Sequence, residues 1–120
     1  MAKSVLITDD TLYSRSLLRD ILYSKGYQVV GEARNGREAV ERYKELKPDL
    51  VTMDVVMPEL DGVAAVKLIK EFDPKATILV ISSMGHRAMV LEALSAGAAD
   101  FVTKPFREHL VIRSVKKLIG

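Results

Sequence analysis

The sequence predicts an α/β domain in which a parallel five-stranded sheet is covered by helices on both faces. Two observations predict it. Five short apolar runs alternate with five longer stretches of helical spacing. The runs are apolar throughout rather than at every second position, which is typical of strands buried on both faces. With 120 residues and 48% apolar content, the chain has the size and composition of one globular domain.

The five apolar runs are the expected strands. In chain order they are Val5–Thr8, Gln28–Val30, Leu50–Met53, Thr77–Ile81 and Phe101–Thr103. Right-handed crossovers between parallel strands leave few ways to order them in a sheet. In open sheets of this class, ligands bind beyond the carboxyl ends of the strands. The residues that follow each run are therefore where a functional site is expected.

The expected helices follow the strands, and each carries an apolar stripe with a marked end. The second helix opens at Asn35, which forms a capping-box pattern with Glu38 three residues later. Glycines end the first and fourth helices, prolines follow the second and third, and a proline precedes the fifth. These residues are Gly26, Gly97, Pro48, Pro74 and Pro105. The stripes, in helix order, are Leu17, Leu18, Ile21 and Leu22; Ala39, Val40 and Tyr43; Val66, Ile69 and Phe72; Val90, Leu91 and Leu94; and Val111, Val115 and Leu118.

Composition excludes several classes of protein. Eighteen basic and sixteen acidic residues are interspersed and give a net charge of +2, which does not favour a dedicated nucleic-acid-binding protein. The chain has no cysteine, so disulfides and thiolate zinc sites are excluded. His86 and His109 lack ligand spacing and are expected at solvated helical positions. Neither a signal peptide nor a membrane-spanning apolar stretch is found, so we expect a cytoplasmic protein that does not enter the membrane.

Charged and polar residues stand at the carboxyl ends of the expected strands, where the fold would bring them together. They are Asp9, Asp10, Glu32, Asp54, Ser82 and Lys104. Asp10 or Thr11 could instead cap the helix that follows, and Lys104 could be an ordinary solvated lysine. Asp54 is harder to explain in this way, because apolar residues flank it on both sides. A carboxylate buried there needs a cation.

Carboxylates that converge within a few ångströms repel one another, and a divalent cation relieves that repulsion. Mg²⁺ takes oxygen ligands and needs only one or two carboxylates when a substrate phosphate completes its shell. The chain lacks the acidic loop of an EF-hand. The segment from Gly31 to Gly36 has the glycine spacing of a phosphate-binding loop, but Arg37 and Glu38 follow in place of lysine and serine or threonine. We therefore expect Mg²⁺ together with phosphate chemistry.

The arrangement of these residues resembles the response-regulator receiver domains. The shared motifs are Asp9-Asp10 after the first run, "MDVVMPELDG" around Asp54, Ser82 after the fourth run and "KPF" from Lys104. The match spans residues 1–120 as one receiver domain, and the run "LKPDLVTMDVVMPELDG" is similar to the single-domain chemotaxis regulators. The resemblance implies the flavodoxin-like (βα)5 doubly wound fold, with the strand order 2-1-3-4-5 taken from the family.

The resemblance also implies a role for each site residue. Asp54 would be the phosphoacceptor, attacking the phosphohistidine of a sensor histidine kinase of the CheA type. Asp10, Asp54 and the backbone carbonyl of Val56 would bind Mg²⁺ directly, and Asp9 would act largely through water. Lys104 would neutralise phosphoryl charge. Such a protein is not an enzyme with a separate substrate, although it catalyses its own phosphorylation and dephosphorylation.

A switch is expected to connect this site to a partner surface. The Ser82 hydroxyl would bind a phosphoryl oxygen, and Phe101 would rotate inward to fill the space that the moving loop vacates. The readout surface would be the fourth helix, fifth strand and fifth helix, spanning Arg87–Leu94 and Phe101–Val115. Its target would be a downstream protein such as a flagellar motor switch protein, and a phosphatase is a further expected partner. The protein is expected to be a monomer that binds no nucleic acid directly.

The sequence departs from the family at several positions. Thr8 stands where an apolar residue is usual, and Phe101 replaces the tyrosine of many chemotaxis members. Val56 and Met84 occupy positions that influence access of the hydrolytic water. Because apolar side chains there cannot orient that water, slow self-dephosphorylation is expected.

Three other functions stay open on the sequence. The chain could be the receiver domain of a DNA-binding transcriptional regulator, a phosphorylation-independent interaction module, or a flavodoxin-like FMN carrier. The complete acidic site disfavours the interaction module. The absence of a phosphate-binding loop after the first strand disfavours the FMN carrier.

Overall fold

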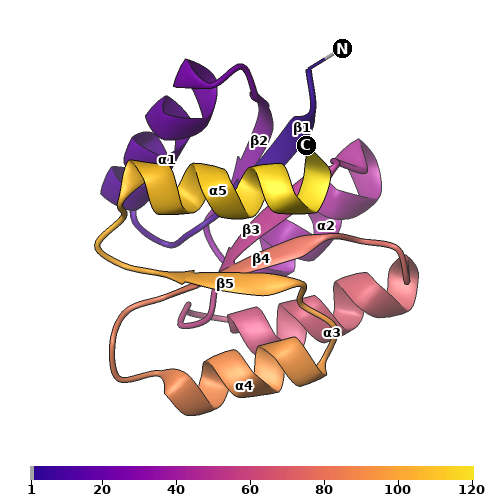
Figure 1. Ribbon diagram of the computed structural model, residues 1–120. Coiled ribbons are helices and arrows are strands. Elements are labelled where there is room, and N and C mark those ends of the chain that lie inside the picture. The colour runs from indigo at the N-terminus through magenta and orange to yellow at the C-terminus, as the bar shows by residue number, and fades with distance from the viewer. Residues whose placement is uncertain (1) are drawn as a thin grey trace.

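The computed structural model describes residues 2–120 as five strands and five helices that alternate along the chain (Figure 1). The strands are β1 (Ser4–Thr8), β2 (Gln28–Ala33), β3 (Leu50–Asp54), β4 (Ile78–Ser82) and β5 (Asp100–Thr103). The helices are α1 (Leu12–Ser24), α2 (Gly36–Leu46), α3 (Gly62–Phe72), α4 (Arg87–Ser95) and α5 (Glu108–Ile119). The strands form one parallel sheet in the order β2-β1-β3-β4-β5. The expected fold class and strand order are confirmed.

The helix ends follow the sequence signals closely. Thr11 is the N-cap of α1, and its hydroxyl accepts a hydrogen bond from the Ser14 N–H at 3.3 Å, so Thr11 rather than Asp10 takes the capping role. Asn35 caps α2 in the same way, accepting from the Glu38 N–H at 2.8 Å. The Glu38 carboxylate accepts from the N–H of Arg34, one residue before the N-cap. The capping box is therefore shifted by one residue from its usual form.

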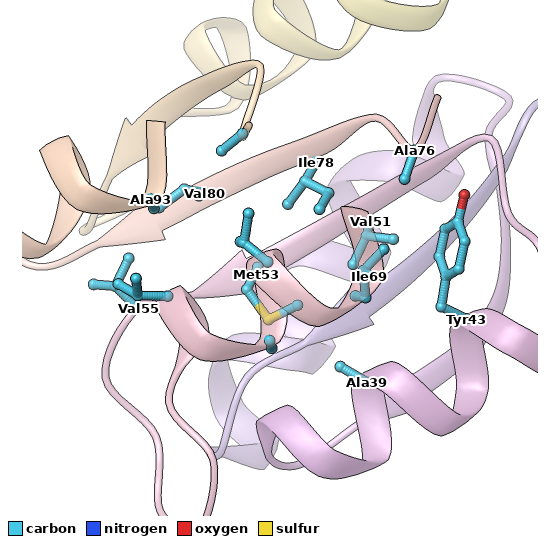
Figure 2. Close-up of a cluster of buried hydrophobic side chains, with 14 of the residues drawn as sticks. Ala39, Tyr43, Val51, Met53, Val55, Ile69, Ala76, Ile78, Val80 and Ala93 are labelled. Atoms are coloured by element: carbon cyan, nitrogen blue, oxygen red, sulfur yellow. The ribbon is translucent and has the colours of Figure 1, made fainter. Parts of the chain in front are cut away.

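The sheet separates two apolar clusters, and neighbouring residues of β1 and of β4 contribute to different clusters. Val5 and Ile7 of β1 pack with α1 and α5, whereas Leu6 packs with α2, α3 and α4. Figure 2 shows the cluster to which Leu6 belongs, with Met53 and Val51 of β3 facing the helices on that side of the sheet. Both faces are thus covered, and this explains why the strand sequences are apolar throughout.

Two residues of the expected apolar stripes are not part of the core. Phe72 and Leu91 are about half exposed, at 46% and 52%. Phe72 lies at the end of α3, where its ring meets the edge of the Tyr43 ring with centroids 6.4 Å apart. Leu91 lies on the outer side of α4, which buries only Val90 and Ala93. In residues 2–120, no helix has the length and apolarity needed to cross a membrane.

Candidate functional site

Three carboxylates converge at the carboxyl ends of the two central strands that precede α1 and α3. Asp9 and Asp10 follow β1, and Asp54 is the last residue of β3, which pairs with β1. One carboxylate oxygen from each lies within 4.8 Å of the other two. The loops from β4 to α4 and from β5 to α5 leave the sheet at this same end (Figure 1). The strand-end convergence expected for these three residues is confirmed.

Asp9 is buried, and one of its carboxylate oxygens is held by the turn that it begins. Its Oδ1 accepts hydrogen bonds from the Thr11 N–H at 3.0 Å and from the Thr11 hydroxyl at 3.2 Å. Its own N–H donates to the Ala33 carbonyl at 3.0 Å, which ties it to the end of β2. The remaining oxygen, Oδ2, points toward Lys104. Asp10 by contrast is exposed, so its carboxylate is the one open to solvent.

Lys104 brings a positive charge from the end of β5 into this acidic cluster. Its Nζ lies 2.7 Å from Asp9 Oδ2 and 3.2 Å from Asp54 Oδ2. Burial alone would lower the pKa of Lys104, but its hydrogen bond to Asp9 and the charges of Asp54 and Asp9 outweigh that effect and raise it. Lys104 is thus not a solvated strand-end lysine.

Asp54 is buried, and its backbone turns sharply after β3. Its Oδ1 accepts a hydrogen bond from the Val56 N–H at 3.3 Å. Burial raises the pKa of Asp54, the neighbouring Asp9 charge adds to the increase, and Lys104 offsets only part of it. The ionised form of this carboxylate is therefore costly in the metal-free protein, and a bound cation would stabilise it.

The donor set suits a hard divalent cation such as Mg²⁺. Asp9, Asp10 and Asp54 supply only oxygen atoms, and Asp10 leaves an open, solvated side for waters and a phosphoryl group. Neither His86 nor His109 belongs to the group. Asp10 and Asp54 are the expected direct ligands of the ion, and the hydrogen bond from the Val56 N–H keeps the Val56 backbone next to Asp54.

Ser82 joins the site through β4 and its link to β5. The Ser82 carbonyl accepts the Lys104 N–H at 2.9 Å, so the two residues are directly connected across the sheet. The Ser82 side chain is buried, and its hydroxyl donates to the Ser83 carbonyl at 2.8 Å. A phosphoryl group would have to draw this hydroxyl away from Ser83, and its role as a phosphate ligand stays a prediction.

Phe101 lies on the outer side of β5 and is 43% exposed. Beside it is a groove of about 260 Å³ that is also lined by α4 residues, among them Val90, Leu91 and Leu94. The aromatic ring is therefore outside the core in this structure. Its inward rotation stays a prediction.

Glu32 does not join the acidic cluster, which corrects the expectation that its carboxylate converges with the others. It lies within β2, which continues to Ala33, and its two oxygens pair with Arg15 at 2.9 Å and Arg19 at 2.7 Å. Arg15 also donates from Nη1 to the Asp9 carbonyl at 2.8 Å. The sequence reasoning missed Arg15, although a signal exists: it stands three residues before Leu18, on the apolar stripe of α1, where a buried arginine requires an acidic partner.

Comparison with known proteins places this geometry in a family. Residues 5–116 match the family model of the response regulator receiver domain. The chain is 55% identical over 118 residues to the chemotaxis protein CheY of Thermotoga maritima, covering 98% of each protein. It is 49% identical to CheY of Bacillus subtilis over the full length of both. A chain in the crystal structure of the CheX–CheY–BeF3–Mg²⁺ complex from Borrelia burgdorferi superposes with a TM-score of 0.93 at 34% identity, over 98% of this chain and 90% of that one.

Proposed function

Because the chain belongs to the response regulator receiver domain family, we propose that it is a cytoplasmic, single-domain response regulator of a two-component chemotaxis system, phosphorylated on Asp54. The observation that carries the proposal is the contact of Lys104 with both Asp9 and Asp54, in a cluster that Asp10 completes. Two central strands and an edge strand converge to build it. Such a cluster has oxygen ligands for a divalent cation and a fixed ammonium for a phosphoryl oxygen.

The phosphoryl transfer uses these groups in distinct ways. An Asp54 carboxylate oxygen attacks phosphorus, the bond from phosphorus to the histidine nitrogen of the kinase breaks, and the imidazole leaves with the bonding electron pair. Lys104 Nζ lies 3.2 Å from Asp54 and neutralises negative charge on the transferred phosphoryl group. Asp10, Asp54 and the Val56 carbonyl would hold Mg²⁺, with Asp9 acting through water, and the ion would supply positive charge against the phosphoryl oxygens. Positioning and charge neutralisation account for most of the catalysis of such transfers, so few residues suffice.

Phosphorylation would be relayed to a partner through Ser82 and Phe101. The Ser82 hydroxyl exchanges its bond to the Ser83 carbonyl for a phosphoryl oxygen, and the loop before α4 moves with it. Phe101 then turns from its exposed position into the vacated space. The surface of α4, β5 and α5 changes shape as a result, and a downstream target such as a flagellar motor switch protein binds the changed form.

The similar proteins support the proposal that a sensor kinase and a phosphatase are partners of this protein. A CheA-type sensor kinase is the proposed phosphoryl donor, because the chain is 55% and 49% identical to two chemotaxis CheY proteins. The Borrelia burgdorferi complex contains CheX together with CheY, BeF3 and Mg²⁺, and this supports both an Mg²⁺ site and a protein partner such as a phosphatase. The chain acts as a monomeric signalling protein that catalyses only its own phosphorylation and dephosphorylation.

Sequence similarity favours this function over the receiver of a DNA-binding regulator. The chain is 55% and 49% identical to the two CheY relatives, but 29% identical to NtrX from Brucella abortus. The acidic cluster favours a phosphoacceptor over a phosphorylation-independent interaction module or an FMN carrier.

Mass spectrometry tests the phosphoacceptor directly. Incubation with acetyl phosphate and Mg²⁺ should add one phosphoryl group to the wild-type protein and none to Asp54→Asn. Asp100→Asn is the control, because it makes the same substitution at the first residue of β5, the end opposite to the acidic cluster, and it should be phosphorylated normally. An adduct that persists in Asp54→Asn, or no adduct on the wild type, would overturn the proposal. A pull-down with and without beryllofluoride and Mg²⁺ then identifies the target of the activated surface.

A further inference from the structure

A buried arginine contacts the backbone of the acidic cluster at Asp9. Arg15 of α1 is 9% exposed. Its Nη1 donates to the Asp9 carbonyl at 2.8 Å, and its Nε donates to Glu32 Oε1 at 2.9 Å. The guanidinium therefore bridges the turn after β1 to the neighbouring strand β2.

Glu32 holds this guanidinium in one orientation. A buried guanidinium is costly unless it is paired, and its planar fork fixes the direction of each hydrogen bond. The second oxygen of Glu32 is taken by Arg19 at 2.7 Å, so both carboxylate oxygens are occupied. The Arg19 side chain is 48% exposed, and it donates a hydrogen bond to Glu32 rather than to the acidic cluster.

The carbonyl that Arg15 holds is placed where it controls the metal ligands. The Asp9 carbonyl and the Asp10 N–H belong to the same planar peptide unit. The Asp9 N–H is fixed to Ala33, and the Asp9 side chain to Thr11. The hydrogen bond from Arg15 fixes the next peptide plane, which sets the direction in which the Asp10 chain leaves Asp9.

We propose that Arg15, oriented by Glu32, is a positioning residue that sets the geometry of Asp9 and Asp10 and thereby the affinity for Mg²⁺. The inference rests on the proposed metal site, and it adds a residue that no carboxylate pattern reveals. Groups behind metal ligands commonly change metal affinity by about 10- to 100-fold when removed, because they fix ligand orientation.

The direction of the effect separates positioning from simple electrostatics. Arg15 carries a positive charge close to a cation site. By Coulomb's law alone, Arg15→Ala should therefore bind Mg²⁺ more tightly. Loss of positioning predicts the opposite change. Arg19→Ala removes the same charge from the same carboxylate partner without touching Asp9, so it is the matched control.

Isothermal titration of the metal-free full chain with MgCl2 tests the inference. We expect Arg15→Ala to weaken Mg²⁺ binding by about tenfold or more. Arg15→Lys should recover only part of this, because an ammonium on a straight stem lacks the two diverging donors of the guanidinium. Arg19→Ala should bind at least as tightly as the wild type. Circular dichroism at the titration temperature confirms that each variant is folded.

Glu32→Gln keeps the inference testable if Arg15→Ala does not fold. It leaves Arg15 in place but weakens the pair that orients it, and its Mg²⁺ affinity should fall between those of wild type and Arg15→Ala. The inference is overturned if Arg15→Ala is folded and binds Mg²⁺ as tightly as the wild type or more tightly. If Arg15→Ala is unfolded, the same result for a folded Glu32→Gln overturns it. Equal weakening in Arg19→Ala also overturns it. A wild-type protein that binds no Mg²⁺ would instead contradict the proposed metal site itself.

Discussion

The Lys104 ammonium lies 2.7 Å from the Asp9 carboxylate and only slightly farther, at 3.2 Å, from that of Asp54. In the metal-free protein this one side chain therefore stands between two carboxylates from adjacent strands. Removing it leaves two buried like charges that repel each other, with no compensating cation in that position.

Lys104→Met should accordingly lower the free energy of unfolding of the metal-free protein by about 2 kcal/mol. The loss is smaller than the roughly 3–5 kcal/mol of a fully buried pair, because Lys104 keeps some contact with solvent. Added Mg²⁺ should restore more stability to this variant than to the wild type, since the ion replaces the missing charge. Urea denaturation with EDTA or with MgCl2 measures both effects.

Lys117→Met is the control. It breaks an exposed pair with Asp100 at 3.7 Å and should change stability little. Equal losses in the two variants would contradict the prediction.

The raised pKa of Asp54 predicts a pH dependence of stability. A carboxyl group whose pKa is higher in the folded than in the unfolded protein binds its proton more readily when folded. Its stabilising contribution is fully present below the unfolded pKa and is lost as pH rises through the folded pKa. At neutral pH the ionised Asp54 therefore costs stability, even with Lys104 beside it.

Asp54→Asn, which cannot ionise, should be more stable than the wild type at neutral pH when metal is absent. The difference should shrink as pH falls toward about 4, where free aspartic acid takes up its proton. Urea midpoints in EDTA across this range give the measurement. A variant that is less stable than wild type at neutral pH would show that the Lys104 pair outweighs the burial cost.

Asp10→Ala should separate metal binding from folding. Asp10 is exposed and Thr11 caps α1, so the side chain makes little contribution to the helix start. We expect Mg²⁺-dependent phosphorylation to be abolished, while the metal-free protein stays as stable as the wild type or becomes more so through reduced repulsion. Thr11→Ala is the converse control: it should cost about 1 kcal/mol of stability as a lost cap, yet keep all three carboxylates. An Asp10→Ala protein that also unfolds would point back to a capping role.

The sequence predicts those parts of the site whose position follows from the alternation of side chains along a strand and from the common direction of the strands. Asp9 and Asp54 directly follow apolar runs, so the pleat and the shared strand direction bring them together. Glu32 looks equivalent in sequence, but β2 continues to Ala33 and two arginines from α1 neutralise its carboxylate. That pairing depends on how α1 packs against β2, and a tertiary contact of this kind cannot be read from strand patterns. The same holds for Phe101, whose exposure depends on the arrangement of α4 beside β5.

Two exposed apolar side chains in the loops that follow Asp54 and Ser82 predict a long-lived phosphorylated form. Val56 is 44% exposed two residues after Asp54, and Met84 is 85% exposed two residues after Ser82. Neither can accept a proton from water or orient it for attack on phosphorus. Val56→Gln and Met84→Glu should therefore speed loss of the phosphoryl group, by about tenfold, which is less than the roughly 100-fold that a well-aligned base supplies.

Phosphate release after removal of the donor measures this rate. Leu91→Gln is a suitable control, because Leu91 is similarly exposed but lies on α4 and should leave the rate unchanged. Decay of the wild-type phosphoprotein within seconds would contradict the prediction, as would equal rates in wild type and both polar variants.

The close approach of α3 to β3 predicts that Gly62 cannot be replaced. A Cβ on Gly62 would lie 2.1 Å from the Asp54 carbonyl oxygen and 2.7 Å from the Val55 Cα, and both of these are backbone atoms that cannot move aside. Gly31 also leaves little room, but its nearest neighbour at 2.8 Å is the end of the flexible Leu46 side chain. Gly62→Ala should therefore destabilise the protein by about 2–4 kcal/mol, the range of severe packing defects, and Gly31→Ala by clearly less. Because the clash displaces the Asp54 backbone, Gly62→Ala should also slow phosphorylation by acetyl phosphate under conditions where it remains folded. Equal urea midpoints for the two alanine variants would show that α3 can shift away from β3 without cost, and the position of Asp54 would then not depend on this contact.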